Sequence, residues 1–359
     1  MCSDPAPQTP RVDPAPAGAG GAGPALPLEP VDSVTLLTVC DNTVDILLTD
    51  QGPARRLSLR GSMTGETAPP LPARSLQEGK GPDLPIAEHG FSMLVEVRKG
   101  PSVRRLLFDT GVTPRGCVQN LRRLGRDPRD IEVIVCSHGH FDHTTGLSGL
   151  ADWLGRPNMP VVIHPEFWTQ RRLTAPGPEP VVMPTTSRRA LESAGFDIVE
   201  ERRPSFLFDR SVLITGEVDR TTDFERGAPN HQAWRSDRWE PDPLILDDQA
   251  LIVHVAGRGL VVLTGCGHAG VVNICRYARR LTGVDRLHAV AGGFHLNGPA
   301  FEPVIAPTLD AFEQLAPDVL IPAHCTGWKA THAMAGRFPE AFVQNSVGTR
   351  FDLVSAPAP

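Results

Sequence analysis

Residues 137–143 read Ser-His-Gly-His-Phe-Asp-His, and this string constrains the fold of the chain more than any other feature. On an extended segment, His138 and His140 can both reach one cation, while the adjacent Asp142 and His143 can reach a second. Imidazole with a carboxylate suits zinc, iron or manganese better than calcium, which needs more oxygen ligands. Four potential ligands within six residues predict a centre for two divalent metal ions rather than an ordinary polar loop.

The sequence on either side predicts how this string is held. Residues 113–125 begin with Thr-Pro, carry apolar side chains at helical spacing and end at a glycine, which is typical of a short helix. Residues 131–136 are a continuous apolar run of strand length, and the leucine spacing in 147–154 predicts a second helix. The string therefore lies where a strand is followed by a helix, which is where α/β folds bind ligands.

Three later histidines also follow predicted strands. His268, His295 and His324 come shortly after strands expected at residues 260–264, 287–291 and 319–322. This repeated placement predicts that the three side chains meet at one edge of the fold. We predict His268 and His324 as metal ligands. For His295 two roles stay open, a metal ligand or a residue that orients a ligand through a hydrogen bond.

Further motifs carry a resemblance to a known family. They are Leu-Leu-Phe-Asp-Thr-Gly at 106–111, Asp-Asp-Gln-Ala-Leu at 247–251, Leu-Thr-Gly-Cys-Gly-His-Ala-Gly at 263–270, Gly-Gly-Phe-His-Leu at 292–296 and Pro-Ala-His-Cys-Thr-Gly at 322–327. With the histidine string they resemble the metallo-β-lactamase superfamily. Within it they resemble the branch related to 7,8-dihydropterin-6-methyl-4-(β-D-ribofuranosyl)aminobenzene 5'-phosphate synthase, in which many bacterial proteins are described only as metal-dependent hydrolases.

The resemblance covers about residues 34–354. It implies an αββα sandwich, in which two mixed β-sheets lie face to face with helices outside and a metal site at one edge. It also implies that His89, in the segment Glu-His-Gly-Phe-Ser, borders the pocket. Five other histidines have no such context and are interpreted as ordinary surface or core residues: His164, His231, His254, His288 and His332.

Cys266 departs from the pattern of the superfamily, where an aspartate after Thr-Gly bridges the two metals. Two interpretations stay open: a thiolate ligand, which favours zinc or iron, or a buried bystander beside His268, which we favour. A single metal ion, or a loosely bound second ion, is therefore compatible with the sequence. Asp109, at the end of its strand, is expected to orient a histidine ligand, and Asp142 to serve as ligand and proton shuttle.

Net charge and cysteine content indicate which partners and which compartment to expect. The net charge of -6 is mild and the basic residues are scattered, so neither nucleic acid nor a membrane surface is an expected partner. Seven cysteines without a Cys-x-x-Cys pair indicate a reducing compartment, and we expect a cytoplasmic protein that acts on a small molecule.

Two segments depart from the composition of a packed domain. Residues 1–30 contain eight prolines, six alanines and four glycines, which predicts a disordered tail without a secretory signal. Residues 31–359 are expected to form a single domain. Within it, the Gly- and Pro-rich stretch 52–85 predicts a loop insertion that either covers the site or is an idle solvated loop.

Three functions are compatible with these features. The first is a metal-dependent hydrolase that uses activated water on a small phosphorylated or ester substrate, with Arg220 and Lys329 as candidate contacts for an anion. The second, implied by the resemblance, is a synthase that condenses an aminobenzoate with phosphoribosyl pyrophosphate. The third is a metal-binding module without turnover.

Overall fold

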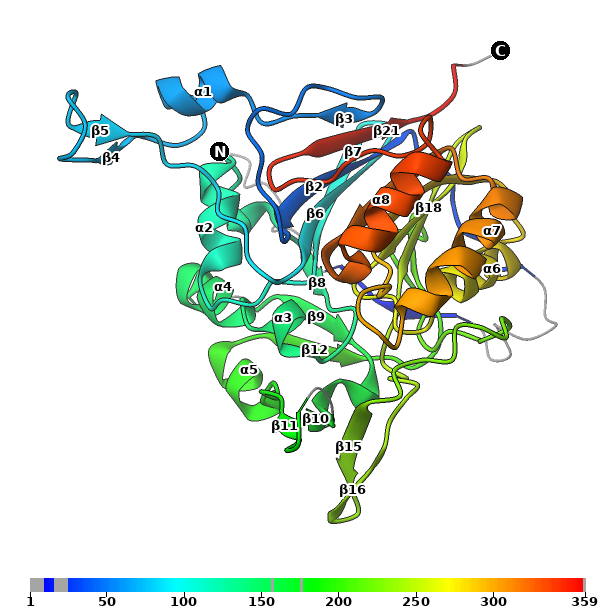
Figure 1. The fold of residues 1–359 in the computed structure, drawn as a ribbon. Helices are drawn as coiled ribbons and strands as arrows, with labels where there is room; N and C mark the ends of the chain where they lie inside the picture. The colour runs from blue at the N-terminus through cyan, green and yellow to red at the C-terminus, as the bar shows by residue number, and fades with distance from the viewer. Residues whose placement is uncertain (1–9, 16–24, 156–157, 175–176, 358–359) are drawn as a thin grey trace, which may run out of the picture.

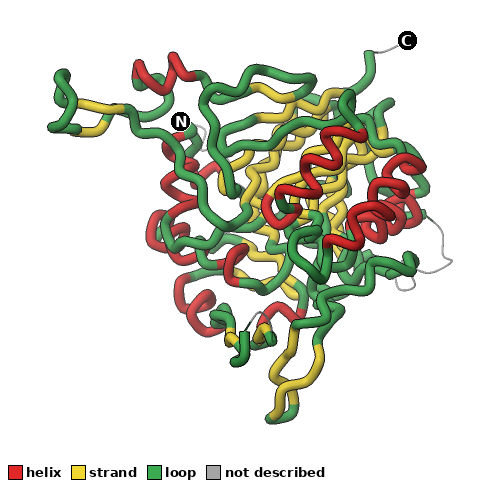
Figure 2. The backbone as a smooth tube through the Cα atoms, in the orientation of Figure 1, coloured by secondary structure: helices red, strands yellow, loops and turns green. Residues whose placement is uncertain are grey.

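Two mixed β-sheets pack face to face, with helices on both outer faces (Figures 1 and 2). The computed structural model describes residues 10–15, 25–155, 158–174 and 177–357. Side chains from both sheets share one apolar core between them, and a separate apolar cluster lies beneath the helices on each outer face. This arrangement confirms the predicted αββα sandwich.

The first sheet has eight strands. Their spatial order is β12 (Asp197–Glu200), β9 (Pro160–Ile163), β8 (Val133–Val135), β7 (Ser102–Phe108), β6 (Ser92–Lys99), β2 (Ser33–Cys40), β21 (Arg350–Val354) and β3 (Ala54–Arg55). Strands β7, β8, β9 and β12 run parallel to one another, and the other neighbours pair antiparallel. All three residues of β8 are buried, as expected of a strand covered on both faces.

The second sheet has seven strands. Their order is β1 (Asp13–Pro14), β13 (Ser205–Leu207), β14 (Val212–Ile214), β17 (Leu251–Val255), β18 (Gly259–Thr264), β19 (Leu287–Gly293) and β20 (Val319–Ala323). Strands β18, β19 and β20 are parallel, so their carboxyl ends lie at one edge. Side chains alternate along β18: Val261 and Leu263 enter the core between the sheets, while Leu260 and Val262 face the helices.

Helices cover the two outer faces. The first sheet carries α2 (Gly116–Arg123), α4 (Leu147–Leu154) and α5 (Arg188–Ala194), and the second carries α6 (Val271–Thr282), α7 (Ile305–Leu315) and α8 (Trp328–Arg337). The short helix α3 (Phe141–Thr144) lies within the histidine string. Among the described residues, no helix is both long and apolar enough to cross a membrane.

A third, smaller sheet was not predicted from the sequence. It consists of β11 (Val181–Val182), β10 (Arg171–Leu173), β15 (His231–Arg235) and β16 (Arg238–Pro241), and the β15–β16 hairpin protrudes at the bottom of Figure 1. These strands lack the long apolar runs that identify the strands of the sandwich. Arg171 and His231 reach the functional site from this sheet.

The predicted disordered tail is wrong for its described parts. Strand β1 pairs with β13, and Ala15, Leu26 and Leu28 are buried. The backbone N–H of Leu26 donates to the carbonyl of Leu281 at the end of α6, 2.6 Å away. A few apolar side chains among prolines therefore suffice to dock residues 10–15 and 25–30, while the remainder of the expected tail lies outside the described residues.

The stretch 52–85 is also more structured than an idle loop. It contains β3, the helix α1 (Leu59–Thr64) and the two-stranded hairpin of β4 (Leu71–Pro72) and β5 (Lys80–Gly81), at the upper left of Figure 1. Asp83 forms an ion pair with Arg123 of α2, with 2.6 Å between Oδ1 and Nε. The segment thus packs beside α2, and none of its described residues lines the cavities around the histidines.

Removing residues 1–30 is expected to destabilise the protein. Losing the burial of Leu26 and Leu28 against the domain would cost roughly 3–6 kcal/mol of folding free energy, at about 1.5–3 kcal/mol for each buried leucine. Differential scanning calorimetry of the deletion variant should show a melting temperature lower by several degrees. Deletion of residues 1–9 removes none of the described contacts and serves as the control. Equal melting temperatures for both deletions would show that the docked segment contributes no stability.

Candidate metal centre

The carboxyl ends of strands from both large sheets meet at one edge of the sandwich. The histidine string follows β8 of the first sheet, whereas Cys266, His268, His295 and His324 follow β18, β19 and β20 of the second. All seven predicted ligands, including His295, therefore lie at the same edge. The parallel order of neighbouring strands within each sheet produces this convergence.

Three residues at this edge have strained backbones. Asp109, His295 and His324 have φ angles of 58°, 45° and 49°, in the left-handed region that non-glycine residues rarely adopt. Such conformations cost about 1–3 kcal/mol each and persist where surrounding structure imposes them, commonly at functional sites.

One cluster contains three buried imidazoles. His138 Nε2 lies 3.0 Å from His140 Nδ1, and the ring of His268 is centred 4.8 Å from that of His138 and 5.0 Å from that of His140. Burial lowers the pKa of all three imidazoles well below the usual value. They are therefore neutral at pH 7, the state in which imidazole binds a metal.

A second cluster contains Asp142, His143 and His324. Oδ2 of Asp142 lies 3.3 Å from His324 Nε2 and 3.8 Å from His143 Nε2. Although burial alone would raise it, the pKa of Asp142 is held below its usual range by His143 and His324. Asp142 is thus a carboxylate, and it is only partly exposed.

Cys266 lies between the two clusters. Its Sγ is 3.2 Å from His143 Nε2, and it lies within 4.8 Å of potential ligand atoms in both clusters. Burial raises the pKa of its thiol well above the usual value, so a bound cation would have to displace the proton. This position supports the thiolate-ligand interpretation over the bystander that we favoured from the sequence.

Several buried nitrogen atoms at this edge have no hydrogen-bond partner among the described residues. They are His140 Nε2, both ring nitrogens of His268, His295 Nδ1 and His324 Nε2. Leaving a buried polar atom unpaired costs about 1–3 kcal/mol. Coordination to divalent cations would satisfy these nitrogens, and the set of imidazole, carboxylate and thiol donors fits zinc or iron.

Asp109 fixes the position of His143 in the second cluster. Its Oδ1 accepts from the backbone N–H of Ser137 at 2.7 Å, and its Oδ2 lies 2.7 Å from His143 Nδ1. Burial alone would lower the pKa of His143, but the carboxylates of Asp109 and Asp142 raise it to about 9. This position fits the role predicted for Asp109, which is to orient a histidine ligand.

Two more carboxylates fix the loops that carry the ligands. Asp247 Oδ2 accepts from the backbone N–H of Gly139 at 2.8 Å, and Asp41 Oδ1 accepts from that of His324 at 2.8 Å. Asp247 lies in the Asp-Asp-Gln-Ala-Leu motif at 247–251, whereas no motif around Asp41 predicts this role.

Arg171 neutralises the buried carboxylates, and sequence reasoning missed it. Its Nη2 donates to Asp247 Oδ1 at 2.6 Å and its Nε to Asp242 Oδ2 at 2.8 Å, with only 2% of the side chain exposed. Burial alone would lower the pKa of Arg171, but the two carboxylates raise it. An isolated arginine in a polar segment gives no sequence signal for such a role.

His231, interpreted from the sequence as an ordinary surface or core residue, lies beside the candidate ligands. Its ring stacks on that of His140, with centroids 5.3 Å apart and an angle of 24° between the planes. Burial lowers its pKa to about 4, so it is neutral at pH 7. It lines the cavity above the metal ligands.

That cavity has a volume of about 540 Å³. Its wall includes the candidate ligands His140, Asp142, Cys266, His268 and His295. The other described residues that line it are His89, Phe141, Leu173, Met183, Asn230, His231, Asn297, Gly298, Pro299, Ala300, Phe301 and Cys325. The volume is within the range of small-molecule sites.

Of the three predicted substrate contacts, only His89 lines this cavity. His89 is exposed, and its Nε2 lies 4.0 Å from Asp142 Oδ2. Arg220 instead donates from Nη1 to the carbonyl of His268 at 3.0 Å and so supports the ligand loop. Lys329 is exposed and pairs with Glu302, with 2.5 Å between Nζ and Oε2. The structure therefore gives Arg220 and Lys329 other contacts than the predicted anion.

Comparison with known proteins agrees with this geometry. Residues 87–281, more than half of the chain, match the family model of the metallo-beta-lactamase superfamily. The chain is 28% identical over 267 residues to the 7,8-dihydropterin-6-methyl-4-(beta-D-ribofuranosyl)-aminobenzene-5'-phosphate synthase of Methanocaldococcus jannaschii. That match covers 73% of this chain and 89% of the relative.

Two further similarities extend the comparison. An uncharacterized protein of the same archaeon, MJ0448, is 29% identical over 246 residues, which are 68% of this chain and 86% of that protein. The crystal structure of Tm1679, a metal-dependent hydrolase of the beta-lactamase superfamily, superposes with a TM-score of 0.63 at 23% identity, covering 90% of this chain and 100% of that chain. The structural similarity supports the fold.

Replacing Arg171 should destabilise the protein strongly. Arg171→Met leaves buried Asp247 without a counter-charge and leaves Asp242 with Arg235 alone, and removing one partner of a buried ion pair costs about 3–5 kcal/mol. Arg188→Met is the control, because Arg188 pairs with Glu200 at the surface, where an ion pair contributes at most about 1 kcal/mol. Urea denaturation followed by circular dichroism measures both variants. Similar midpoints would mean that the buried network contributes little to stability.

Metal content should depend on both clusters and on Cys266. Elemental analysis of purified His140→Ala should show loss of most bound metal, because an incomplete set of ligands holds the ion weakly. His332→Ala, which removes an exposed histidine remote from the ligands, should keep the wild-type content. Cys266→Ser should lose about one metal equivalent if the thiolate is a ligand. Full metal retention in Cys266→Ser would restore the bystander interpretation, and full retention in His140→Ala would contradict the site.

Proposed function

Because the chain belongs to the metallo-beta-lactamase superfamily, we propose that it is a metal-dependent hydrolase of a small ester or phosphoester. The observation that carries this proposal is the set of unpaired, buried imidazole nitrogens beside a cavity of about 540 Å³. Imidazole nitrogens without hydrogen-bond partners beside a cavity are suited to binding a cation that faces a substrate. A purely structural metal site would instead be closed off from solvent by its ligands.

The residues divide into two candidate coordination groups. His138, His140 and His268 would hold one ion, and Asp142, His143 and His324 a second, with Cys266 between them. When bound, a divalent ion such as zinc lowers the pKa of water to about 7, which makes hydroxide available at neutral pH.

Asp142 is the residue best placed to handle the proton. It lines the cavity, it is ionised, and Oδ2 lies 4.0 Å from the exposed ring of His89. Asp142 and the exposed His89 therefore mark the side of the cavity from which a proton would leave to solvent, across a 4.0 Å gap that one water molecule can bridge. Asp109 and Asp247 act indirectly, because they hold His143 and the backbone of Gly139 in place.

The similarity to the archaeal synthase supports a second candidate function. The name of that relative describes a product in which a dihydropterin-methyl group is joined to a ribofuranosylaminobenzene phosphate. This differs from the condensation of an aminobenzoate with phosphoribosyl pyrophosphate, which the resemblance implied as the alternative to hydrolysis. Either synthesis requires a phosphate contact, yet Arg220 and Lys329 make other contacts. A phosphoester substrate would need the same contact, so the ranking rests on the chemistry. Activated water needs only the ligand set, whereas either synthesis also needs a site for a second substrate, and we rank hydrolysis first.

A substrate panel distinguishes these functions. The zinc-loaded protein should release 4-nitrophenol from a 4-nitrophenyl ester or phosphodiester, and His140→Ala should be slower by at least about 100-fold because it lacks an inner ligand. Incubation with 4-aminobenzoate and phosphoribosyl pyrophosphate should release no carbon dioxide above background. Metal-dependent carbon dioxide release, or condensation of an activated dihydropterin with the aminobenzene phosphate in the absence of hydrolysis, would reject the hydrolase.

A further inference from the structure

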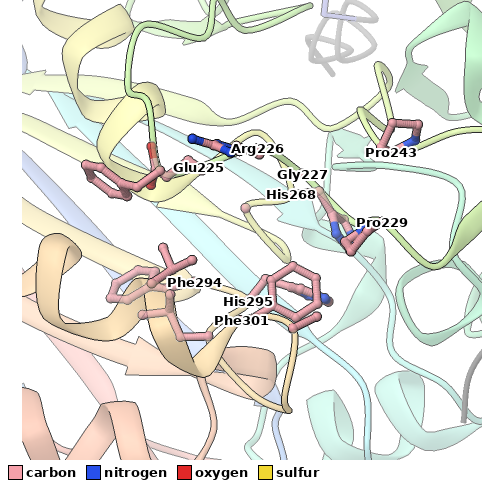
Figure 3. Close-up of a pocket in the computed structure, with 15 residues that line it drawn as sticks. Glu225, Arg226, Gly227, Pro229, Pro243, His268, Phe294, His295 and Phe301 are labelled. Atoms are coloured by element: carbon pink, nitrogen blue, oxygen red, sulfur yellow. The ribbon is translucent and has the colours of Figure 1, made fainter.

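A second cavity adjoins the metal centre and has a different character. It has a volume of about 300 Å³ and shares four wall residues with the larger cavity, namely His268, His295, Ala300 and Phe301. In Figure 3, Phe294, His295 and Phe301 lie along one side of this chamber, and Glu225 and Arg226 lie along the other. The two cavities therefore adjoin at His268 and His295, so that one ligand with two parts can be matched to both.

The wall of the chamber is mainly apolar. Its described apolar residues are Phe224, Pro229, Pro243, Phe294, Leu296, Ala300, Phe301 and Val304. The ring of Phe301 meets that of His295 edge to face, with centroids 4.4 Å apart and an angle of 86°. Aromatic rings of a ligand bind well against such edges and faces.

The charged groups of the chamber already have partners. Glu225 accepts from the backbone N–H groups of Val272 and Asn273, both at 2.8 Å, and thereby caps α6. Arg226 is exposed and donates from Nε to the carbonyl of Asp223 at 2.7 Å. A ligand inside the chamber would meet mainly apolar side chains and the residues His268 and His295.

The larger cavity is equally poor in cationic side chains. Among the described residues that line it there is no lysine or arginine. A phosphate monoester carries close to two negative charges at neutral pH, and binding sites for such groups commonly use arginine or lysine. Outside the cations at the metal ligands, the described wall residues supply no positive charge for such a group, and this favours a substrate that is neutral at its reacting group.

We propose that the substrate is a neutral carboxylic ester bearing an aromatic ring, with the ester at the metal ligands and the ring in the chamber. At roughly 30 Å³ for each water-sized atom, the chamber holds about ten non-hydrogen atoms, enough for one or two fused rings. Hydrolysis forms a bond from the water oxygen to the acyl carbon and breaks the bond to the alcohol oxygen. The alcohol leaves with one proton from water, so no further reactant is needed.

This inference rests on the proposed hydrolase function, and three substrates test it. Methyl phenylacetate carries the ring on a neutral ester, methyl acetate lacks the ring, and benzyl phosphate places the ring on a phosphate monoester. The zinc-loaded wild type should hydrolyse methyl phenylacetate with kcat/KM at least about tenfold above either of the others, since burial of a ring contributes more than the 1.4 kcal/mol that corresponds to tenfold.

Two substitutions test the chamber itself. Val304→Phe fills it and Phe224→Ala enlarges it, and neither residue lines the larger cavity. Each should raise KM for methyl phenylacetate at least about fivefold, through lost contact with the ring, while methyl acetate stays within about twofold. Trp328→Ala is the control, because Trp328 is 74% exposed and lines neither cavity. Melting temperatures of all variants confirm folding.

The outcomes separate the two proposals. A preference for benzyl phosphate, or equal KM changes for both methyl esters, overturns the inference. If no substrate is hydrolysed, the hydrolase proposal fails, and ligand-observed NMR of 2-phenylacetamide, which lacks the ester bond, tests the chamber alone. Binding that is at least about fivefold weaker in Val304→Phe than in wild type supports the chamber as a site for aromatic rings. Equal binding rejects it.

Discussion

Burial of imidazoles without hydrogen-bond partners is the energetic constraint on which this structure depends. Each unpaired nitrogen destabilises the folded chain unless something coordinates it, and several lie within one edge of the sandwich. The surrounding chain compensates by fixing the backbone and the rings. Asp109 holds His143, Asp247 holds the segment at Gly139, and Asp41 holds the backbone of His324. The donor atoms are thus oriented before any cation arrives, which lowers the free-energy cost of ordering them on binding.

Arg171 shows how far such support extends from the donor atoms. It contacts no candidate ligand, yet it is the counter-charge for Asp247 and Asp242. It comes from the small third sheet, whose hairpin otherwise projects into solvent. This sheet also delivers His231 to the ring of His140. The small third sheet, which is the part of the fold least like a core, therefore supplies both a counter-charge and a part of the cavity wall.

The sequence predicted what depends on local periodicity and on dense motifs. The buried run at β8, the helices α2 and α4 and the strands before His268, His295 and His324 all follow from apolar spacing. Contacts between distant segments left no local pattern. Leu26 is buried beside the end of α6, and this contact cannot be predicted from the composition of a Pro-rich segment.

Charged residues were the hardest to assign from sequence. Arg220 looked free for an anion, but a guanidinium is equally suited to holding carbonyl oxygens, and only the fold decides between these uses. For Cys266 the sequence left two roles open, a thiolate ligand or a buried bystander beside His268, because a cysteine can serve in either. Its distance from His143 became known only when both sheets were in place.

The convergence of ligands from two sheets has a mechanical consequence. His138 and His140 belong to the first sheet and His268 to the second, while Asp142 and His143 face His324 across the same seam. A cation held by either group would link the two large sheets at this edge. Separation of the sheets and release of the ion would then be a single event. The resistance of the protein to unfolding would therefore rise with the concentration of free metal around it.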